Sequence, residues 1–454
     1  MHPRLSTTLT ALLVLVCVQE ALSCESVFPH KLDVGLFALA SRRSSTTGKP
    51  EAYWKKLCTP EDARDTVIPN KDTYVITHGL QQGYVEADEQ FGDIVEVTDI
   101  LQVLSPGVPN ILMFRWTQFA DDAIENFERV EAKIYDTRAF NGMQYLFVDT
   151  DDNGHKKPRW ADAVGDDRVS VADRFAIEFV RMFNGDTGWH ASRLNLDYEI
   201  RLIGHSLGSQ LVTATAFRIM YPSNFSNVAD ALSQIHAPHV GISRVTLLDP
   251  MFSIGNRLFF NNINPYGPDV MHVLSGYIER MLADFGIPTE SYKTSKIRNC
   301  EGGKVNHVPI LKAVAYERVK MLEWGNIKAG NCFTPRMLQG NPVRNYKDFI
   351  WQSIMEHIYA IEYYFKSAVF PPHQCIRTED HHDCMPIEAL ALSAAMDTPT
   401  VRYYAQHVFE DIGKGCFVQF NDRKHGRNMS VVSVLDHSPE NDLFYLQTCD
   451  SVNF

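Results

Sequence analysis

The chain has 454 residues, of which 45% are hydrophobic and 22% are charged, so it is long enough to bury a large core. Its formal net charge of −12 argues against nucleic acid as a partner and against electrostatic binding to anionic lipid. This composition favours one enlarged α/β domain over two equal domains.

The N-terminus has the pattern of a secretory signal peptide. A basic start precedes an apolar run from Leu9 to Val18, and the small residues Ala21 and Ser23 fit cleavage after residue 23. The apolar run is shorter than the roughly 20 residues that span a bilayer, and no other segment qualifies. We therefore expect a secreted, extracellular protein without a transmembrane segment, in which a signal peptide (1–23) precedes a single domain (24–454).

Cysteine usage agrees with export. The chain has nine cysteines, and eight remain once the signal peptide, which holds Cys17, is removed. Pairing of neighbours along the chain would give Cys24–Cys58, Cys300–Cys332, Cys375–Cys384 and Cys416–Cys449, a connectivity that the sequence alone does not fix. Asn224 and Asn428 lie in glycosylation sequons, which are meaningful in a eukaryotic host.

A β-branched strand is predicted from Thr73 to Thr77, and it runs into a turn formed by His78 and Gly79. A glycine at this point lets the chain turn its backbone amides toward a neighbouring element. We interpret His78 as a structural, hydrogen-bonding residue of this turn rather than as a catalytic base.

The stretch 149–167 is predicted as an exposed loop. Its start, Asp149–Gly154, copies the first half of a calcium-binding loop, but the twelfth position is Trp160 instead of glutamate, and basic residues intrude. We interpret it as a polar surface turn and expect no metal site.

The most informative motif is Gly204-His205-Ser206-Leu207-Gly208, which places a serine between two glycines. A strand-like run, 197–203, precedes the serine, and a helix-forming run, 207–220, follows it. A strand, a sharp turn and a helix are the context of a nucleophile elbow, in which the serine hydroxyl is exposed at the start of the helix. Ser206 is therefore the candidate nucleophile.

A serine nucleophile needs an orienting carboxylate, a base and donors for an oxyanion. Asp249 ends a strand-like run, where loops of α/β folds place functional groups, so it is the candidate acid. The backbone N–H groups of Leu80 and Leu207 are the candidate oxyanion donors. His307 and His357 both follow Asp249, and either could be the base at this point of the argument.

Between Cys300 and Cys332, the run 308–324 has apolar residues at helical spacing with charged residues interspersed. This pattern predicts an amphipathic helix. The helix would either move over a neighbouring site or pack permanently on the core, and the pattern favours neither.

Several of these segments resemble the pancreatic lipase family of secreted α/β-hydrolases. The residues after His357 that carry the resemblance are Ala360, Tyr363, Tyr364 and Ser367, whereas nothing comparable follows His307. Cys375 and Cys384 match a close cysteine pair of the family, and Leu443–Thr448 is similar to the strand that closes its catalytic domain. The likeness covers most of the mature chain.

The resemblance implies an α/β-hydrolase fold with a mostly parallel central sheet and flanking helices. Since only 449–454 follow the closing strand, we expect no C-terminal β-sandwich domain of the kind that some relatives have. The resemblance also implies a serine esterase without a cofactor that cleaves acyl esters of lipids, like a triacylglycerol lipase, at a lipid–water interface. Ser206, Asp249 and His357 would form the triad, and 300–332 would form a lid.

The chain also departs from the family. Met355 and Tyr359 stand where the family has cysteine and arginine, and the acidic cluster that binds calcium in some relatives is not reproduced. His307 therefore remains an alternative base, and phospholipase A1 an alternative activity. A different class of function is a non-catalytic lipid-binding or storage protein, similar to insect yolk proteins. The sequence identifies no protein partner.

Overall fold

The computed structural model describes residues 32–43, 45, 48, 50–68, 71–81, 109–122, 127–138, 142–164, 168–183, 198–235, 241–251, 270–293, 314–317, 357, 360–361, 363–365, 367–368, 373–377, 384–390, 395–403, 405–406, 416–419 and 443–447. The predicted signal peptide, His307, Asn428 and most of the 300–332 segment lie outside these residues.

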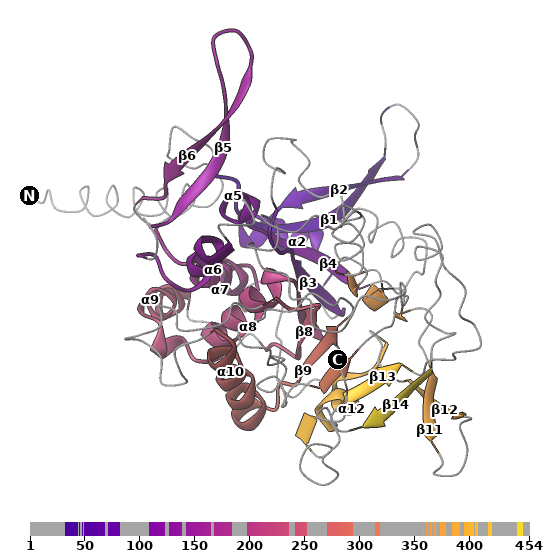
Figure 1. Cartoon of the computed structure of the whole chain (residues 1–454). Coiled ribbons are helices and arrows are strands. Elements are labelled where there is room, and N and C mark those ends of the chain that lie inside the picture. Colours follow the sequence, from indigo (N-terminus) through magenta and orange to yellow (C-terminus); the bar gives the residue numbers. More distant parts are fainter. Residues whose placement is uncertain are drawn as a thin grey trace, which may run out of the picture.

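Between residues 156 and 293 the described strands alternate with helical segments, whereas strands follow one another in pairs or longer runs elsewhere (Figure 1). The strands are β1 (Gly35–Arg43), β2 (Pro50–Lys56), β3 (Thr73–Thr77), β4 (Asn110–Arg115), β5 (Gln144–Thr150), β6 (Lys156–Asp162), β7 (Ile200–His205), β8 (Arg244–Leu248), β9 (Thr289–Lys293), β10 (Val314–Glu317), β11 (His373–Arg377), β12 (Cys384–Leu390), β13 (Cys416–Gln419) and β14 (Leu443–Gln447). The helices are α2 (Pro60–Thr66), α5 (Thr117–Ala120), α6 (Phe127–Tyr135), α7 (Val171–Met182), α8 (Leu207–Met220), the 3-10 helix η5 (Pro222–Asn224), α9 (Ser226–Ile235), α10 (Val270–Phe285) and α12 (Thr398–Tyr403).

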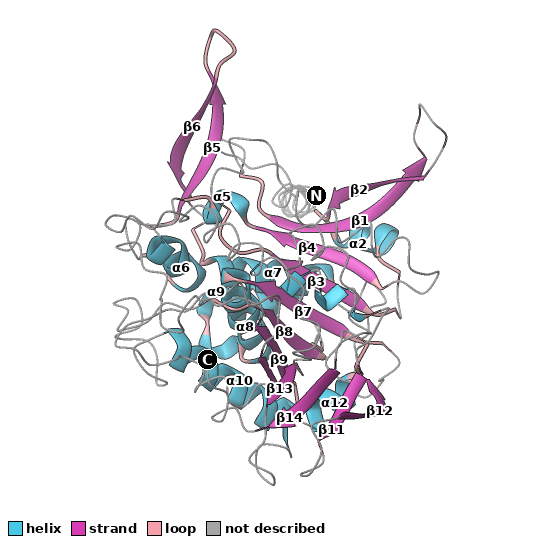
Figure 2. Cartoon of the chain, turned by 45° about the vertical axis from the view of Figure 1, so that its right-hand side comes forward, coloured by secondary structure: helices cyan, strands magenta, loops and turns pink. Residues whose placement is uncertain are grey.

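Twelve strands form one sheet, in the order β12-β11-β14-β13-β10-β9-β8-β7-β3-β4-β1-β2 (Figure 2). Its centre, from β4 through β3, β7, β8, β9 and β10 to β13, is parallel throughout. Antiparallel pairs occur toward both edges, between β1 and its neighbours and among the C-terminal strands. In a parallel sheet the carboxyl ends of the strands lie along one edge, and the loops that follow them can meet there.

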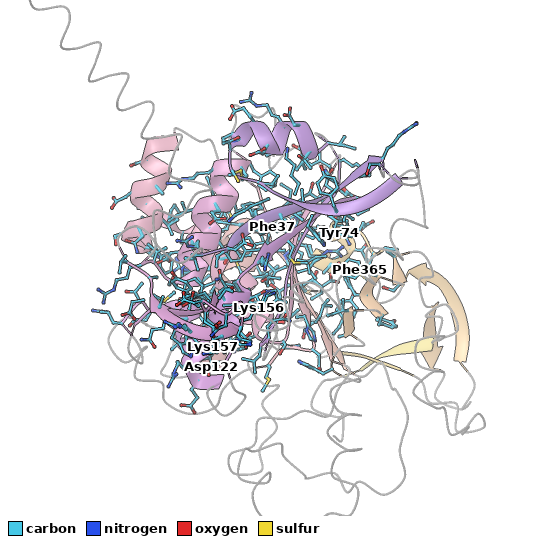
Figure 3. All side chains as sticks on the ribbon, turned by 90° about the horizontal axis from the view of Figure 1, so that it is seen from above. Phe37, Tyr74, Asp122, Lys156, Lys157 and Phe365 are labelled. Carbon is cyan, nitrogen blue, oxygen red and sulfur yellow. The ribbon has the colours of Figure 1, made fainter. Side chains whose placement is uncertain are left out.

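The strands β3, β4, β7 and β8 are buried on both faces, as their largely apolar sequences require. Alternate residues of β3 join two different hydrophobic clusters, since side chains of a strand point to opposite faces in turn. Val75 belongs to the cluster that includes α7, α8 and α10, whereas Tyr74 and Ile76 belong to a second cluster. Figure 3 labels Tyr74 together with Phe365, another member of the second cluster.

The helix that follows the serine lies in the middle of the first face. Every residue of α8 is buried, and α8 packs between α7 and α10. The rings of Phe217 on α8 and Tyr277 on α10 stack with centroids 3.8 Å apart, and Arg218 forms a buried ion pair with Asp173 on α7. Because α8 is fixed on both sides, its first turn is held in place as well.

The second face carries a helical stretch that begins before the sheet's C-terminal strands. Residues 357, 360, 361, 363–365 and 367 are helical, and Tyr364 is fully buried against the sheet. Its hydroxyl lies 3.2 Å from Arg201 on β7, 3.4 Å from Thr246 on β8 and 3.3 Å from Glu290 on β9. One hydroxyl group thus ties this stretch to three neighbouring strands.

The helix predicted over 308–324 is wrong for the part that the structure describes. Val314–Glu317 form β10, which pairs in parallel with β9 on one side and β13 on the other. The sequence Val-Ala-Tyr-Glu fits a buried strand as well as a helix, and pairing with two strands distant in sequence decides between them. The centre of the expected lid is therefore part of the sheet.

The described part of the exposed loop predicted over 149–167 is exposed along Lys156–Asp162, but it belongs to an antiparallel hairpin rather than a loop. Its strands, β5 and β6, form a separate two-stranded sheet that projects from the body of the molecule (Figure 1). The turn itself is a polar surface turn, as expected: Gly154 has a φ of +81°, and Asp151 accepts hydrogen bonds from the amides of Asn153 and His155.

Other elements follow the sequence expectations. The strands predicted at 73–77, 197–203 and 242–248 correspond to β3, β7 and β8, and the helix over 207–220 is α8. The run at 443–448 contains β14, which belongs to the same sheet. Among the described residues, no helix combines the length and the apolar character that crossing a membrane requires.

The structure describes some of the predicted disulfide cysteines and one of the two predicted glycosylation sites. Cys58 is disulfide-bonded, and Asn224 is exposed in η5. Cys375 and Cys384 lie in the paired strands β11 and β12, two positions away from facing each other directly, and Cys416 begins β13. Cys24, Cys300, Cys332 and Cys449 lie outside the described residues.

Candidate active site

Ser206 occupies a sharp turn between β7 and α8. Its φ of +57° lies in a region that residues with side chains rarely adopt. The flanking glycines allow this turn: a Cβ on Gly204 would overlap the carbonyl group of Gly208, and a Cβ on Gly208 would lie 2.6 Å from the carbonyl oxygens of Thr77 and His78. The local geometry is that of a nucleophile elbow.

Asp249 follows β8, the strand directly beside β7. The ladder between the two strands continues to the end, where the Ser206 amide donates to the Leu248 carbonyl at 3.0 Å. Asp249 is fully buried and has a φ of +41°, and its amide donates to the carbonyl of Tyr292 at 2.6 Å. Among the residues that the structure describes, Ser206 and Asp249 are the two non-glycine positions with positive φ.

His357 lies at the carboxyl edge of these strands, and its Nδ1 forms a hydrogen bond with the carboxylate of Asp249. The two residues are 108 positions apart in the sequence. A carboxylate only accepts hydrogen bonds, so Nδ1 carries the proton, and in the neutral ring Nε2 is left as an acceptor. The His357 side chain is 14% exposed, whereas the Asp249 side chain is fully buried.

His205 packs against His357, a contact that the sequence did not predict. The two rings lie with centroids 4.4 Å apart, and His205 Nε2 donates to the main-chain carbonyl of His357 at 2.9 Å. Burial, with a smaller contribution from the neighbouring His357, lowers the pKa of His205 to about 3. His205 is therefore neutral near pH 7. The motif places His205 directly before the serine, but its contact with a residue 152 positions later has no signal in the local sequence.

The turn after β3 lies against the serine. A Cβ on Gly79 would come within 2.5 Å of the Ser206 Cβ, so only glycine fits this close approach. His78 is the structural residue that we expected: its Nδ1 donates to the Gly79 carbonyl at 2.9 Å, and its Nε2 accepts from the amide of Trp116 at 3.3 Å. Burial lowers the pKa of His78 to about 4, so this ring is neutral at pH 7.

The two expected oxyanion donors are placed by these elements. Leu80 directly follows Gly79, and Leu207 is the first residue of α8. The first amide groups of a helix have no partner within the helix, and the Leu207 amide is one of them. The site thus has backbone donors on the turn after β3 and at the start of α8.

The described partner of the Ser206 hydroxyl is Met251 rather than His357. Ser206 Oγ lies 4.0 Å from Met251 Sδ, and the Met251 amide lies 3.4 Å from the Ser206 carbonyl oxygen. Met251 comes two residues after Asp249, and sequence reasoning did not single it out. The hydrogen bond between a catalytic serine and its base often forms only when substrate is bound. The contact of Ser206 with Met251 is therefore compatible with His357 as the candidate base.

The structure therefore brings Ser206, Asp249, His357 and the backbone of 79–80 together at one edge of the sheet. The alternative base, His307, lies outside the described residues. Within the part of the chain that the structure describes, no three histidine, cysteine or acidic side chains are arranged to hold a metal ion.

No protein-family model and no curated protein matches this sequence. Solved structures similar to this chain include a candidate carboxylesterase from Lactobacillus plantarum WCFS1, with 9% identity, a TM-score of 0.24, and coverage of 57% of this chain and 76% of that protein. Another is the peroxisomal alpha-beta-hydrolase Lpx1 from Saccharomyces cerevisiae, with 11% identity, a TM-score of 0.21, and coverage of 50% of this chain and 47% of that protein.

Likeness at these TM-scores assigns no activity. The fold assignment comes from the molecule itself: a mostly parallel central sheet covered by helices, with a serine on a sharp turn between a strand and a helix. These features define an α/β-hydrolase fold.

Proposed function

We propose that this protein is a secreted serine ester hydrolase that cleaves acyl esters of lipids. The observation that carries the proposal is the joint geometry of Ser206, Asp249 and His357. The two strained non-glycine positions among the described residues are the candidate nucleophile and acid, and the acid binds the candidate base. Strain of this kind costs about 1–3 kcal/mol per residue and persists mainly at functional sites.

The chemistry that follows is acyl transfer. Ser206 Oγ attacks the ester carbonyl carbon while His357 Nε2 takes the hydroxyl proton, and Asp249 stabilises the resulting imidazolium. The tetrahedral intermediate collapses by breaking the bond to the alcohol oxygen, which receives the proton from His357. A water molecule, deprotonated by His357, then attacks the acyl carbonyl. The bond from the acyl carbon to Ser206 Oγ breaks, Oγ receives the proton from His357, and the acyl group leaves as a carboxylic acid.

The Leu80 and Leu207 amides would bind the oxyanion of the tetrahedral intermediate. Each donor of this kind contributes about 3 kcal/mol of transition-state stabilisation. The close approach of Gly79 to Ser206 supports this role, because Leu80 is the residue that directly follows Gly79.

The substrate class rests on the sequence resemblance to the pancreatic lipase family. That resemblance favours neutral acylglycerols, with phospholipids as the alternative substrate of a phospholipase A1. Secretion rests on the signal-peptide pattern and is supported by the disulfide bond of Cys58, since disulfides persist in oxidising compartments.

The test compares the purified protein with a Ser206→Ala variant on p-nitrophenyl butyrate, triacylglycerol and phosphatidylcholine. We expect the variant to lose several orders of magnitude in kcat, because the nucleophile is removed. Ser233→Ala, on the exposed side of α9, is the matched control and should retain activity. A labelled fluorophosphonate should attach to Ser206 in the unsubstituted protein. Equal turnover by both proteins would overturn the assignment of Ser206 as the nucleophile. No turnover by either protein, together with failure of the probe to react, would favour the non-catalytic lipid-binding alternative.

A further inference from the structure

Met251 is held over the nucleophile by its own backbone. The Met251 amide donates to the Ser206 carbonyl, and the Met251 carbonyl accepts a hydrogen bond from Gln210 Nε2 at 2.7 Å. Both ends of the residue are thus attached to the nucleophile turn and to α8. Its side chain then extends along Ser206, with the sulfur 4.0 Å from Oγ.

A buried polar chain supports this arrangement from behind. Gln210 is fully buried, and its amide nitrogen also donates to Glu131 Oε1 at 2.8 Å. Its amide oxygen accepts from the Tyr135 hydroxyl at 3.0 Å. Glu131 is fully buried too, and a buried carboxylate is costly unless it is hydrogen-bonded. The catalytic steps use none of these three side chains, yet together they fix the amide that holds Met251.

We infer that Met251 is a specificity-determining residue of the proposed ester hydrolase, and that its side chain limits the size of the substrate group that lies beside Ser206. This inference rests on the proposed function. A thioether sulfur is a weak hydrogen-bond acceptor, so a substrate loses little by displacing it from the serine hydroxyl. The Cα of Met251 stays beside Ser206, because both the amide and the carbonyl of the residue are hydrogen-bonded, so the side chain moves only by rotation about its own bonds.

The bulk of Met251 therefore meets either the acyl chain or the alcohol group of the ester. Methionine is unbranched and has three rotatable bonds, so it can yield to a small group more easily than to a long one. Removal of the side chain should then favour the longer substrate on the side that Met251 borders.

The experiment measures two ratios of kcat/KM. One compares p-nitrophenyl octanoate with p-nitrophenyl acetate, and the other compares octyl acetate with ethyl acetate. Met251→Ala should raise one of the two ratios by about tenfold or more, the scale on which apolar sites discriminate chain length. Met251→Phe, which enlarges the side chain, should lower the same ratio. Either variant alone tests the inference if the other does not fold.

Met220→Ala is the control for a methionine truncation elsewhere. Met220 is buried at the far end of α8, about 20 Å from Ser206 by the rise of the helix, and both ratios should stay as in the parent protein. Ratios that remain within about twofold of the parent in Met251→Ala and Met251→Phe would overturn the inference. The proposed function would stand in that case, provided that Ser206→Ala is inactive; if Ser206→Ala is active, both fail.

Discussion

Gly79 and Ser206 are in such close contact that a methyl group on residue 79 would lie 2.5 Å from the Cβ of Ser206 and 2.9 Å from its Oγ. Gly79→Ala must therefore push the turn after β3 away from the nucleophile. We expect kcat to fall by about 100-fold or more, as on loss of an oxyanion donor. The overpacking should also lower the free energy of unfolding by about 1–3 kcal/mol. Steady-state kinetics and urea unfolding measure the two effects.

Gly154→Ala provides the control for this substitution. Gly154 has a φ of +81° with no atom within 4 Å of the added Cβ, and it lies in the hairpin turn far from Ser206. Its substitution should cost about 1 kcal/mol of stability through backbone strain and leave kcat unchanged. If Gly154→Ala lowered kcat as much as Gly79→Ala, the loss would reflect general destabilisation rather than the oxyanion turn.

The identity of the base is a separate prediction. His357 binds Asp249 through Nδ1, so His357→Ala should lower kcat by several orders of magnitude. His307→Ala should retain most of the activity. The two variants are compared on a soluble p-nitrophenyl ester, and the reverse pattern would assign the base to His307.

His205 should act as a positioning residue for His357, since it donates a hydrogen bond to the His357 main chain and packs on its ring. His205→Leu fills the site with an apolar side chain and removes the donor, and we expect kcat to fall by about 100-fold through misplacement of the base. His205→Gln can present an amide nitrogen near the position of Nε2 and should recover much of this loss. Equal kcat values for the Leu and Gln variants would show that the hydrogen bond has no such role.

The sequence predicted the elements whose signals are local. The β-branched run at 73–77, the helix over 207–220 and the elbow at Ser206 depend on neighbouring residues, and the structure has them. Residues 314–317 were assigned to a helix because their apolar spacing fits both structures, and pairing of β10 with β13, about 100 residues later, gives the strand.

In the candidate site, too, local sequence signals predicted some residues and long-range contacts placed the others. Ser206 and Asp249 have local signatures, a glycine-flanked serine and a strand that ends in a carboxylate. His205 contacts His357, which is 152 positions away in the sequence. Gln210 contacts Glu131 and Met251, which are 79 and 41 positions away. No periodicity within one segment carries such information, so these supporting residues emerged only from the structure.

Tyr364→Phe tests the hydroxyl group that ties the helical stretch of His357 to the sheet. The substitution keeps the ring but removes contacts with Arg201, Thr246 and Glu290, all of them buried. Leaving buried polar partners unsatisfied should cost about 1–3 kcal/mol in the free energy of unfolding. Tyr403→Phe, at a position 59% exposed, should change stability by less than about 0.5 kcal/mol. Urea unfolding of both variants decides the matter, and equal midpoints would contradict the prediction.

The stability of the protein should fall as the pH is lowered below about 6.5, in part because of His205. In the folded protein, burial lowers the pKa of His205 to about 3, whereas the ordinary value of 6.5 applies to the unfolded chain. Between these values the unfolded chain binds the proton and the folded protein does not, so acid favours unfolding by up to about 1.4 kcal/mol per pH unit for this group. Glu178 is also buried, and burial raises its pKa, so at pH values above its ordinary pKa this group makes acid favour folding. The contribution of His205 therefore has to be isolated.

The measurement is the difference in free energy of unfolding between the parent protein and His205→Gln, from urea titrations at pH 7.5, 6.5, 5.5 and 4.5. The parent should lose stability relative to the variant as the pH falls through this range, and a difference that stays constant would show that His205 is not held neutral in the fold.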